Sequence, residues 1–253
     1  MNEASTSPII QQKAKRFLLL DALRGFTMLS MILYHFLWDL VYIAQIPVHW
    51  YHGTGAYIWQ QSICQTFIIL SGFCWSFGRQ PLKRGLIVFW SGGLITLVTM
   101  LLMPENLVLF GVLTLIGSCM ILMIPLDHIL KNIKPTPIFV ALFATVLILF
   151  IVLHPASNGY PEYAKGNLLT AYLGFPAKEF YSTDYFPLLP WFLLFVAGYL
   201  LHKLCLRLGW LEIPVLKKNL FPPLTFLGRH SLLIYMLHQP ILYGITMLII
   251  LFK

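Results

Sequence analysis

Charge is what this sequence has least of. Asp, Glu, Lys and Arg make up only 10% of its 253 residues, whereas soluble proteins, whose surfaces face water, carry about 25%. So few charges cannot cover the surface of a soluble protein of this length. The hydrophobic content of 58% and the mean hydropathy of +0.78 also exclude a disordered chain. The sequence therefore predicts an integral membrane protein that forms one domain over residues 1–253.

Cysteine is scarce too, and four residues of it exclude a disulfide-rich secreted scaffold. They form no CxxC pair, and three lie inside apolar runs, which favours a role as buried apolar side chains: Cys64, Cys74, Cys119 and Cys205. A cleavable signal peptide is also missing, because residues 1–16 are polar and hold no apolar core followed by a cleavage site. We expect these residues to form a short cytoplasmic tail.

Long apolar runs dominate the rest of the chain. A membrane-spanning helix needs about 20 mostly apolar residues. Seven runs come close to this length: 17–42, 56–78, 85–103, 107–125, 137–154, 187–203 and 230–252. The connection 155–186 is rich in Gly, Pro, Tyr and Asn and holds no such run. We predict an all-α, polytopic transmembrane bundle of about seven spanning helices, with 155–186 as a long extracytoplasmic loop.

The basic residues indicate how this bundle is oriented. If the seven runs cross the membrane in turn, one group of Lys and Arg falls on the side of the N-terminus: Lys13, Lys15, Arg16, Arg79, Lys83, Arg84, Lys131, Lys134, Lys203, Arg207, Lys217, Lys218 and Arg229. A much smaller group falls on the other side: Lys165, Lys178 and Lys253. Excess basic residues mark cytoplasmic loops, so we expect a cytoplasmic N-terminus and an exported C-terminus in the cytoplasmic (inner) membrane. The net charge of +8 then reflects topology, and we expect no nucleic-acid partner.

The first run carries four ionisable residues, which are costly inside a bilayer and normally face the interior of a bundle. At 100° per residue, Asp21, Arg24, His35 and Asp39 fall within an arc of roughly 60° on one helix face. This polar stripe predicts that something polar is held in the core of the bundle.

The stripe divides by depth. Asp21 and Arg24 are three residues apart near the cytoplasmic end, where they can form an ion pair that is either structural or part of a binding site. His35 lies about 16 Å further along the axis and one turn from Asp39. A carboxylate there can orient an imidazole that acts as a general base, and the alternative is a buried structural histidine paired with Asp39.

The last run repeats this theme. Ser231, Tyr235 and His238 lie on one helical face, and Gln239 precedes a proline that interrupts the apolar run. Residues 228–229, Gly-Arg, stand at its cytoplasmic start, where a helix N-terminus and a cation suit a phosphate. The alternative is a basic anchor followed by a packed polar kink.

Two further candidates lie in the predicted outer loops. His49 and His52 are spaced for a shared metal ion but lack a clear third ligand, so a solvated loop is the alternative. Asp184 in the long loop is either structural or functional. The sequence holds no phosphate-binding P-loop, no GxSxG nucleophile motif and no dinucleotide fingerprint.

Several of these motifs occur together in a known family. The sequence resembles the transmembrane acyltransferase superfamily, and most closely the bacterial relatives of heparan-α-glucosaminide N-acetyltransferase. The stretches that carry the resemblance are Leu20–Phe26, Met31–Leu40, Phe110–Leu113 with Ile116–Gly117, Ser182–Phe192, Gly228–Tyr235 and His238–Pro240.

This resemblance implies an enzyme that takes an acetyl group from cytosolic acetyl-CoA and passes it to a hydroxyl or amino group of an extracytoplasmic glycan, glycolipid or amino sugar. We expect no metal cofactor. The implied catalytic residues are His35, Asp39, Asp184 and His238, with His49 or His52 as an alternative base. The implied donor-binding residues are Asp21, Arg24, Arg84, Arg229 and Ser231, and Arg79 and Lys83 add positive charge for the CoA phosphates. A homo-oligomer is compatible with this reading.

Two other functions fit the same polar stripe. In a proton-coupled transporter the stripe would be an ion path, although the sequence shows no inverted repeat and no matched pair of broken helices. In a non-catalytic membrane subunit it would hold a partner of a glycan-assembly system. Saturable binding of acetyl-CoA distinguishes an acyltransferase from both.

Overall fold

The structure is a computed structural model that describes residues 16–133, 135–155 and 160–252. Most of the predicted N-terminal tail and part of the long loop lie outside the described residues. So do four of the basic residues on which the predicted orientation depends, namely Lys13, Lys15, Lys134 and Lys253.

The described chain is helical, and an isolated bridge between Tyr163 and Ala177 is the one place where extended segments pair. Each of the seven predicted runs coincides with a long helix: α1 (Leu18–Tyr42), α2 (Thr54–Trp75), α3 (Pro81–Leu102), α4 (Val112–Leu130), α5 (Thr136–Leu153), α7 (Leu188–Arg207) and α9 (Ser231–Leu251). The predicted fold class is therefore confirmed as an all-helical bundle.

Five of these helices, α3, α4, α5, α7 and α9, are long and apolar enough to cross a membrane. The protein is thus a multi-pass membrane protein. The helices α1 and α2 are equally long but more polar, because α1 carries the stripe and α2 carries Gln60, Gln61 and Gln65. A total of seven spans remains a prediction.

Short helices fill the connections. They are α6 (Leu168–Leu173) and α8 (Pro222–Arg229), together with the 3-10 turns η1 (His49–His52), η2 (Pro104–Asn106), η3 (Trp210–Glu212) and η4 (Pro214–Lys217). Asn167 caps α6 by accepting a hydrogen bond from the backbone N–H of Thr170. The helix α8 was not predicted; it begins with two prolines, a residue type that the first helical turn tolerates.

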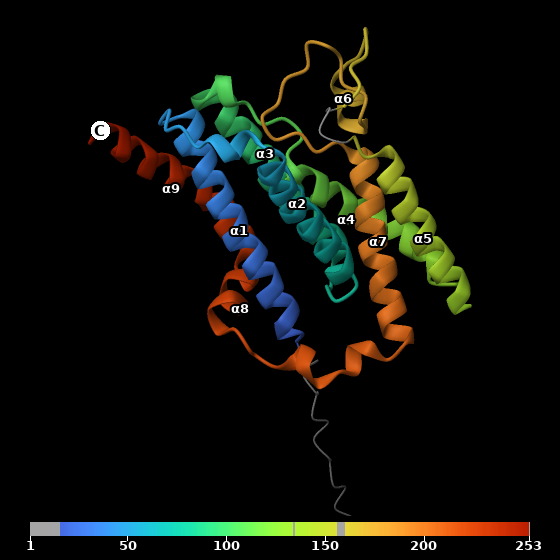
Figure 1. The fold of residues 1–253 in the computed structure, drawn as a ribbon. Helices are drawn as coiled ribbons and strands as arrows, with labels where there is room; N and C mark the ends of the chain where they lie inside the picture. The colour runs from blue at the N-terminus through green and yellow to red at the C-terminus, as the bar shows by residue number, and fades with distance from the viewer. Residues whose placement is uncertain (1–15, 134, 156–159, 253) are drawn as a thin grey trace, which may run out of the picture.

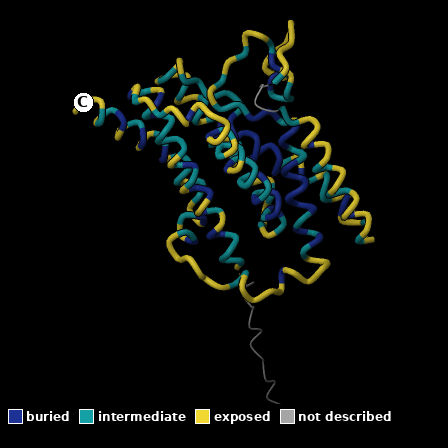
Figure 2. Tube along the Cα trace, in the orientation of Figure 1, coloured by how far each residue is buried: buried dark blue, intermediate teal, exposed yellow. Residues whose placement is uncertain are grey.

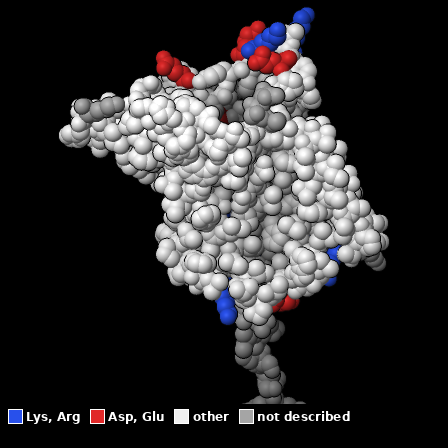
Figure 3. Space-filling model, viewed as in Figure 1, with Lys and Arg blue, Asp and Glu red and all other residues white. Residues whose placement is uncertain are grey.

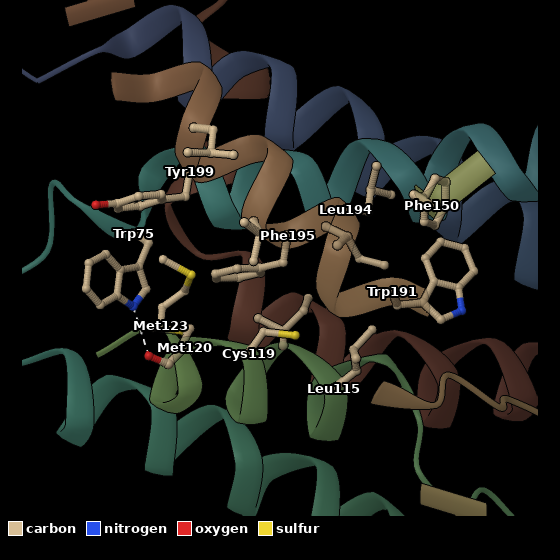
Figure 4. Packing of buried hydrophobic residues seen from close by; sticks show 14 of the residues in the cluster. Trp75, Leu115, Cys119, Met120, Met123, Phe150, Trp191, Leu194, Phe195 and Tyr199 are labelled. Carbon is tan, nitrogen blue, oxygen red and sulfur yellow. Dashed lines mark hydrogen bonds between the residues drawn. The ribbon is translucent and has the colours of Figure 1, made fainter. Parts of the chain in front are cut away.

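The long helices form a central group with others around it (Figure 1). Helices α4 and α7 are the most buried spans, whereas α3 and α5 pack on their outer sides and are largely exposed (Figure 2). The main core lies where α2, α4 and α7 meet. Its members include Trp75, Met120, Phe195 and Tyr199 (Figure 4). There the Trp75 indole N–H donates to the carbonyl of Met120 over 2.9 Å, so this buried polar group is satisfied.

Glycine allows the closest helix contacts. A Cβ added to Gly72 of α2 would lie 2.0 Å from the carbonyl oxygen of Phe195, and one added to Gly198 of α7 would lie 2.2 Å from that of Ile69. Small residues that let backbones touch are typical of helix pairs in membranes, where dispersion rather than the hydrophobic effect holds helices together.

The surface matches a lipid environment. Large apolar side chains are exposed along α3, α5 and α9, among them Trp90, Leu102 and Val152. On the face shown in Figure 3 the charged side chains gather at the two ends of the molecule and leave a wide belt without charge. Such a belt in contact with water would be unfavourable, and it is the expected surface of a bundle in a bilayer.

Candidate functional site

The polar stripe of α1 faces protein, as predicted, and its two ends have different partners. At the end where α1 begins, the buried carboxylate of Asp21 receives Arg24 Nη1 at 3.4 Å, so the predicted ion pair is present. Asp21 is also approached by Arg16 Nε at 2.6 Å and by Arg229 Nε at 3.7 Å. Three guanidinium groups therefore converge on one carboxylate, which leaves a local excess of positive charge.

Arg84, in the first turn of α3, adds to this excess. Its side chain lies over Gly78, and its charge interacts with that of Arg24 and with the Cys74 thiol of α2. Arg24 interacts with the same thiol. We call Arg16, Arg24, Arg84 and Arg229 the arginine cluster. Like charges are brought together at a cost unless an anion offsets them, so the cluster has the electrostatics of an anion site.

The position of Gly228 and Arg229 differs from the prediction. They end the short helix α8 instead of opening the last long helix, which begins at Ser231. The C-terminus of a helix is the negative end of the helix dipole, so it favours a cation and does not attract a phosphate. Arg229 therefore does not combine its charge with a helix N-terminus, as the sequence predicted. Its placement comes instead from close packing of α8 on α1: a Cβ on Gly228 would lie 1.8 Å from the Asp21 carbonyl oxygen. Within the described part of the chain, the Ser231 hydroxyl has no hydrogen bond to the arginine cluster.

Further along α1, His35 meets the last helix. Its Nδ1 lies 2.8 Å from Nε2 of His238, and the two ring planes are inclined by 24°. Nδ1 of His238 in turn lies 2.6 Å from the carbonyl oxygen of Tyr235. His238 is buried, whereas His35 is only partly so. We call these two residues the histidine pair.

The predicted partnership between His35 and Asp39 is wrong. Asp39 is fully buried, and its Oδ1 accepts a hydrogen bond from Nε2 of Gln239 over 2.9 Å. Because His238 and Gln239 are neighbours on α9, one short stretch of α9 binds both α1 residues separately. Asp39 Oδ2 and Gln239 Oε1 are buried and have no hydrogen-bond partner among the residues that the structure describes.

Asp184 reaches the same region from the loop before α7. Its side chain accepts a hydrogen bond from the backbone N–H of Val112, the first residue of α4, and interacts electrostatically with Tyr235. Loss of hydration raises the pKa of Asp184 from 3.8 to about 6, although the bond from Val112 acts in the opposite direction. Asp184 Oδ2 also lies where a side chain on Gly111 would be, at 2.9 Å from an added Cβ.

The contact between Asp184 and Gly111 brings together two of the stretches that carry the family resemblance, 182–192 and 110–113. The hydroxyl of Ser182 bonds both the N–H and the carbonyl of Leu109 at 2.9 Å, and the Phe186 N–H donates to the carbonyl of Phe110. The motif around residue 184 therefore runs beside the motif that opens α4.

The two loop histidines are exposed and lie in η1. Nδ1 of His52 lies 3.4 Å from the hydroxyl of Tyr42, which is two turns beyond His35 on α1. Within the described ranges no group of three or more His, Cys, Asp or Glu side chains is placed to hold a metal ion.

Surface hollows formed by described residues lie at two places away from the histidine pair. One, of about 760 Å3, lies between the segment after α1 and the end of α9, and its lining is apolar: Ile46, Pro47, Ile245, Leu248, Ile249 and Phe252. The other, of about 450 Å3, lies on the outer side of α3 beside Trp90.

Residues 16–240 match the family model described as heparan-alpha-glucosaminide N-acetyltransferase, catalytic. The chain belongs to this family. The match begins at Arg16 and ends just after Gln239, so it includes both the arginine cluster and the histidine pair. No curated protein and no solved structure matches the chain. Membership makes it a membrane protein of an acetyltransferase-like family with transferase activity.

Sequence reasoning missed two members of the site. Gln239 was noted only as a neighbour of Pro240, and the helix α9 in fact continues through that proline. Arg16 was counted as a loop charge although it forms the shortest ion pair of Asp21. A polar amide inside an apolar run was a usable signal for Gln239, since such a group needs a partner in the bundle.

Proposed function

We propose that this protein is a membrane-embedded acetyltransferase that moves an acetyl group from acetyl-CoA to a hydroxyl or amino group of a glycan, glycolipid or amino sugar on the other side of the membrane. The observation that carries the proposal is the arrangement along α1. A cationic cluster lies near one end of this helix, and a partly exposed imidazole lies about 16 Å further along the same face. These are the two parts that such a transfer needs, a site for phosphates and a base.

The arginine cluster is the proposed donor site. Three guanidinium groups share the Asp21 carboxylate and Arg84 adds a fourth positive charge beside Arg24, which leaves charge to bind the CoA phosphates by charge-assisted hydrogen bonds. Arg229 is the most suitable, because its side chain is 42% exposed and its contact with Asp21 is long. Bound there, the donor directs its pantetheine arm along α1 toward His35.

His35 is the proposed general base. The acceptor O–H or N–H gives its proton to His35 as the oxygen or nitrogen attacks the acetyl carbon. The thioester C–S bond then breaks, and the CoA thiolate takes up a proton to leave as the thiol. The proton balance therefore closes without a metal ion or a redox partner.

The proposal includes an orientation. With seven spans and a cytoplasmic N-terminus, the arginine cluster faces the cytosol, where acetyl-CoA is found, in the cytoplasmic membrane. The uneven distribution of Lys and Arg supports this orientation. The start of α1 and the end of α9 lie at opposite ends of the bundle (Figure 1), which supports an odd number of spans.

Transfer in purified protein tests the role of His35. In lipid nanodiscs with acetyl-CoA and an amino-sugar acceptor, we expect His35→Ala to lower kcat by about 10²–10⁴-fold, the usual contribution of a general base. Donor binding and the yield of folded protein should stay near wild type. The matched control is His128→Ala, an exposed histidine of α4 away from the site. Equal activity of the two variants would contradict the assignment and move the base role to His49 or His52.

Donor binding is tested separately. Arg84→Ala and Arg229→Ala should weaken acetyl-CoA more than a short acetyl thioester without phosphates, because the lost bonds are to phosphate oxygens. Lys131→Ala, an exposed cation outside the cluster, is the control. Equal losses for both donors would contradict a phosphate role.

A further inference from the structure

The hydrogen bonds of the histidine pair determine which ring nitrogen carries each proton. The acceptor of the bond from His238 Nδ1 is the carbonyl oxygen of Tyr235, at 2.6 Å. A carbonyl oxygen only accepts, so Nδ1 of His238 must carry a hydrogen. In a neutral imidazole the other nitrogen is then bare, so Nε2 of His238 is an acceptor.

The hydrogen bond between the two histidines extends this constraint on the proton positions to His35 of α1. Nδ1 of His35 lies 2.8 Å from that bare nitrogen and must therefore be the donor. A neutral His35 with its proton on Nδ1 has a free lone pair on Nε2. Among the described residues, Nε2 of His35 has no hydrogen-bond partner. His35 is also the more exposed member of the pair.

We propose that His238 is a positioning residue: it holds His35 in the tautomer whose Nε2 is bare, so that this nitrogen, and not a nitrogen of His238, receives the acceptor's proton. This inference rests on the proposed function and adds a role for His238 to it. Both nitrogens of His238 are already bonded, so His238 cannot act on the acceptor directly.

The pair also accommodates the transferred proton. When Nε2 of His35 takes the acceptor's proton, its Nδ1 proton moves along the 2.8 Å hydrogen bond to Nε2 of His238. No other atom changes partner. His35 is again neutral, His238 is the cation, and the carbonyl of Tyr235 remains bonded to Nδ1. The reverse movement returns the proton through His35 to the leaving CoA thiolate, so the two residues complete the cycle unchanged.

The nitrogen chemical shifts of the histidines test the tautomer without any need for turnover. In full-length protein labelled with ¹⁵N-histidine in nanodiscs, bare and protonated ring nitrogens resonate far apart. Spectra of His35→Gln and His238→Gln assign the signals. We expect His35 and His238 both to be protonated on Nδ1 and bare on Nε2. A resting His35 that is protonated on Nε2 and bare on Nδ1 would overturn the inference.

Kinetics test whether His238 acts through His35. His238→Leu should lower kcat about as far as His35→Ala, by 10²–10⁴-fold, and leave KM for acetyl-CoA nearly unchanged. The double variant should lose little more than either single variant, because the two residues act as one unit. His238→Gln should retain more activity than His238→Leu, because its amide oxygen still accepts from His35. Additive losses, or equal loss in the Gln and Leu variants, would overturn the positioning role.

The two proposals fail in different ways. The wrong tautomer in a protein that transfers acetyl groups overturns the role of His238 and leaves the acetyltransferase standing. The expected tautomer in a protein that transfers nothing supports the hydrogen-bond assignment and overturns the proposed function.

Discussion

At the scale of single residues, four ionisable side chains come together in the region where α1 meets α9: His35, Asp39, Asp184 and His238. Each is an ionisable residue in an unlikely place in the sequence. Helical spacing suggested His35 with Asp39, because residues four apart are neighbours on one helix. Their actual partners come from α9, 200 and 203 positions away along the chain, and no local pattern encodes such a contact.

Asp39 gives a first residue-scale prediction. Asp39 Oδ2 and Gln239 Oε1 are two buried acceptors with no donor between them. Asp39→Asn keeps the shape of the side chain and adds an N–H2 group that can donate, so we expect a melting temperature equal to or above that of wild type in detergent. Activity should fall far less than in His35→Ala. The comparison is Asp39→Leu, which leaves the buried Gln239 N–H2 unpaired and should cost about 1–3 kcal/mol. A loss of stability in Asp39→Asn as large as in Asp39→Leu would contradict this account.

Asp184 gives a pH prediction. Its pKa is about 6 in the folded protein and near 3.8 when unfolded, so the folded state binds more protons between these values. The contribution of Asp184 to stability is therefore present below pH 4 and is lost as pH rises to about 6. Asp184→Asn should remove this part of the pH dependence and melt a few degrees higher than wild type at pH 7. Melting temperatures measured between pH 4 and 7 test this prediction. If the melting temperature of Asp184→Asn varies with pH as it does in wild type, the raised pKa is contradicted.

At the scale of elements, the seven long helices were predictable, because a run of about 20 apolar residues can adopt few structures other than a helix in a lipid bilayer. The helix α8 was not predictable, because it is short, begins with two prolines and ends with the Gly-Arg pair. Its place depends on Gly25 and Gly228, which bring α1 and α8 together. A Cβ on Gly25 would lie 1.9 Å from the carbonyl oxygen of Leu224. Spacing alone did not reveal that these two glycines face each other.

This close approach predicts a large effect of one added methyl group. Gly228→Ala should separate α8 from α1, displace Arg229 from Asp21, and lower both the yield of folded protein and the affinity for acetyl-CoA. Gly244→Ala on α9 is the matched control, since nothing lies within 4 Å of the added Cβ. It should be neutral or stabilising by up to about 1 kcal/mol, the difference in helix propensity. Fluorescence-detected gel filtration compares the two, and equal yields would show that the α1–α8 contact is not tight.

At the scale of the whole molecule, the topology carries the proposed direction of transfer. A reporter fused after Lys253 should be exported, and one inserted near Lys131 should be cytoplasmic. Alkaline phosphatase and green fluorescent protein fusions report the two compartments in bacteria. If both fusions report the same side, an even number of spans lies between residues 131 and 253, and the topology proposed here is wrong.

The most direct test of the central claim is sided transfer in proteoliposomes. Acetyl-CoA labelled in the acetyl group is supplied only on the side of the arginine cluster, and an amino sugar only on the other side, with the orientation of the protein checked by protease accessibility. We expect labelled acetyl-sugar to accumulate with the acceptor in wild type and in the control His128→Ala, and to fall about 10²–10⁴-fold in His35→Ala. Saturable donor binding with no labelled product on the acceptor side, or equal product from His35→Ala, would contradict the account.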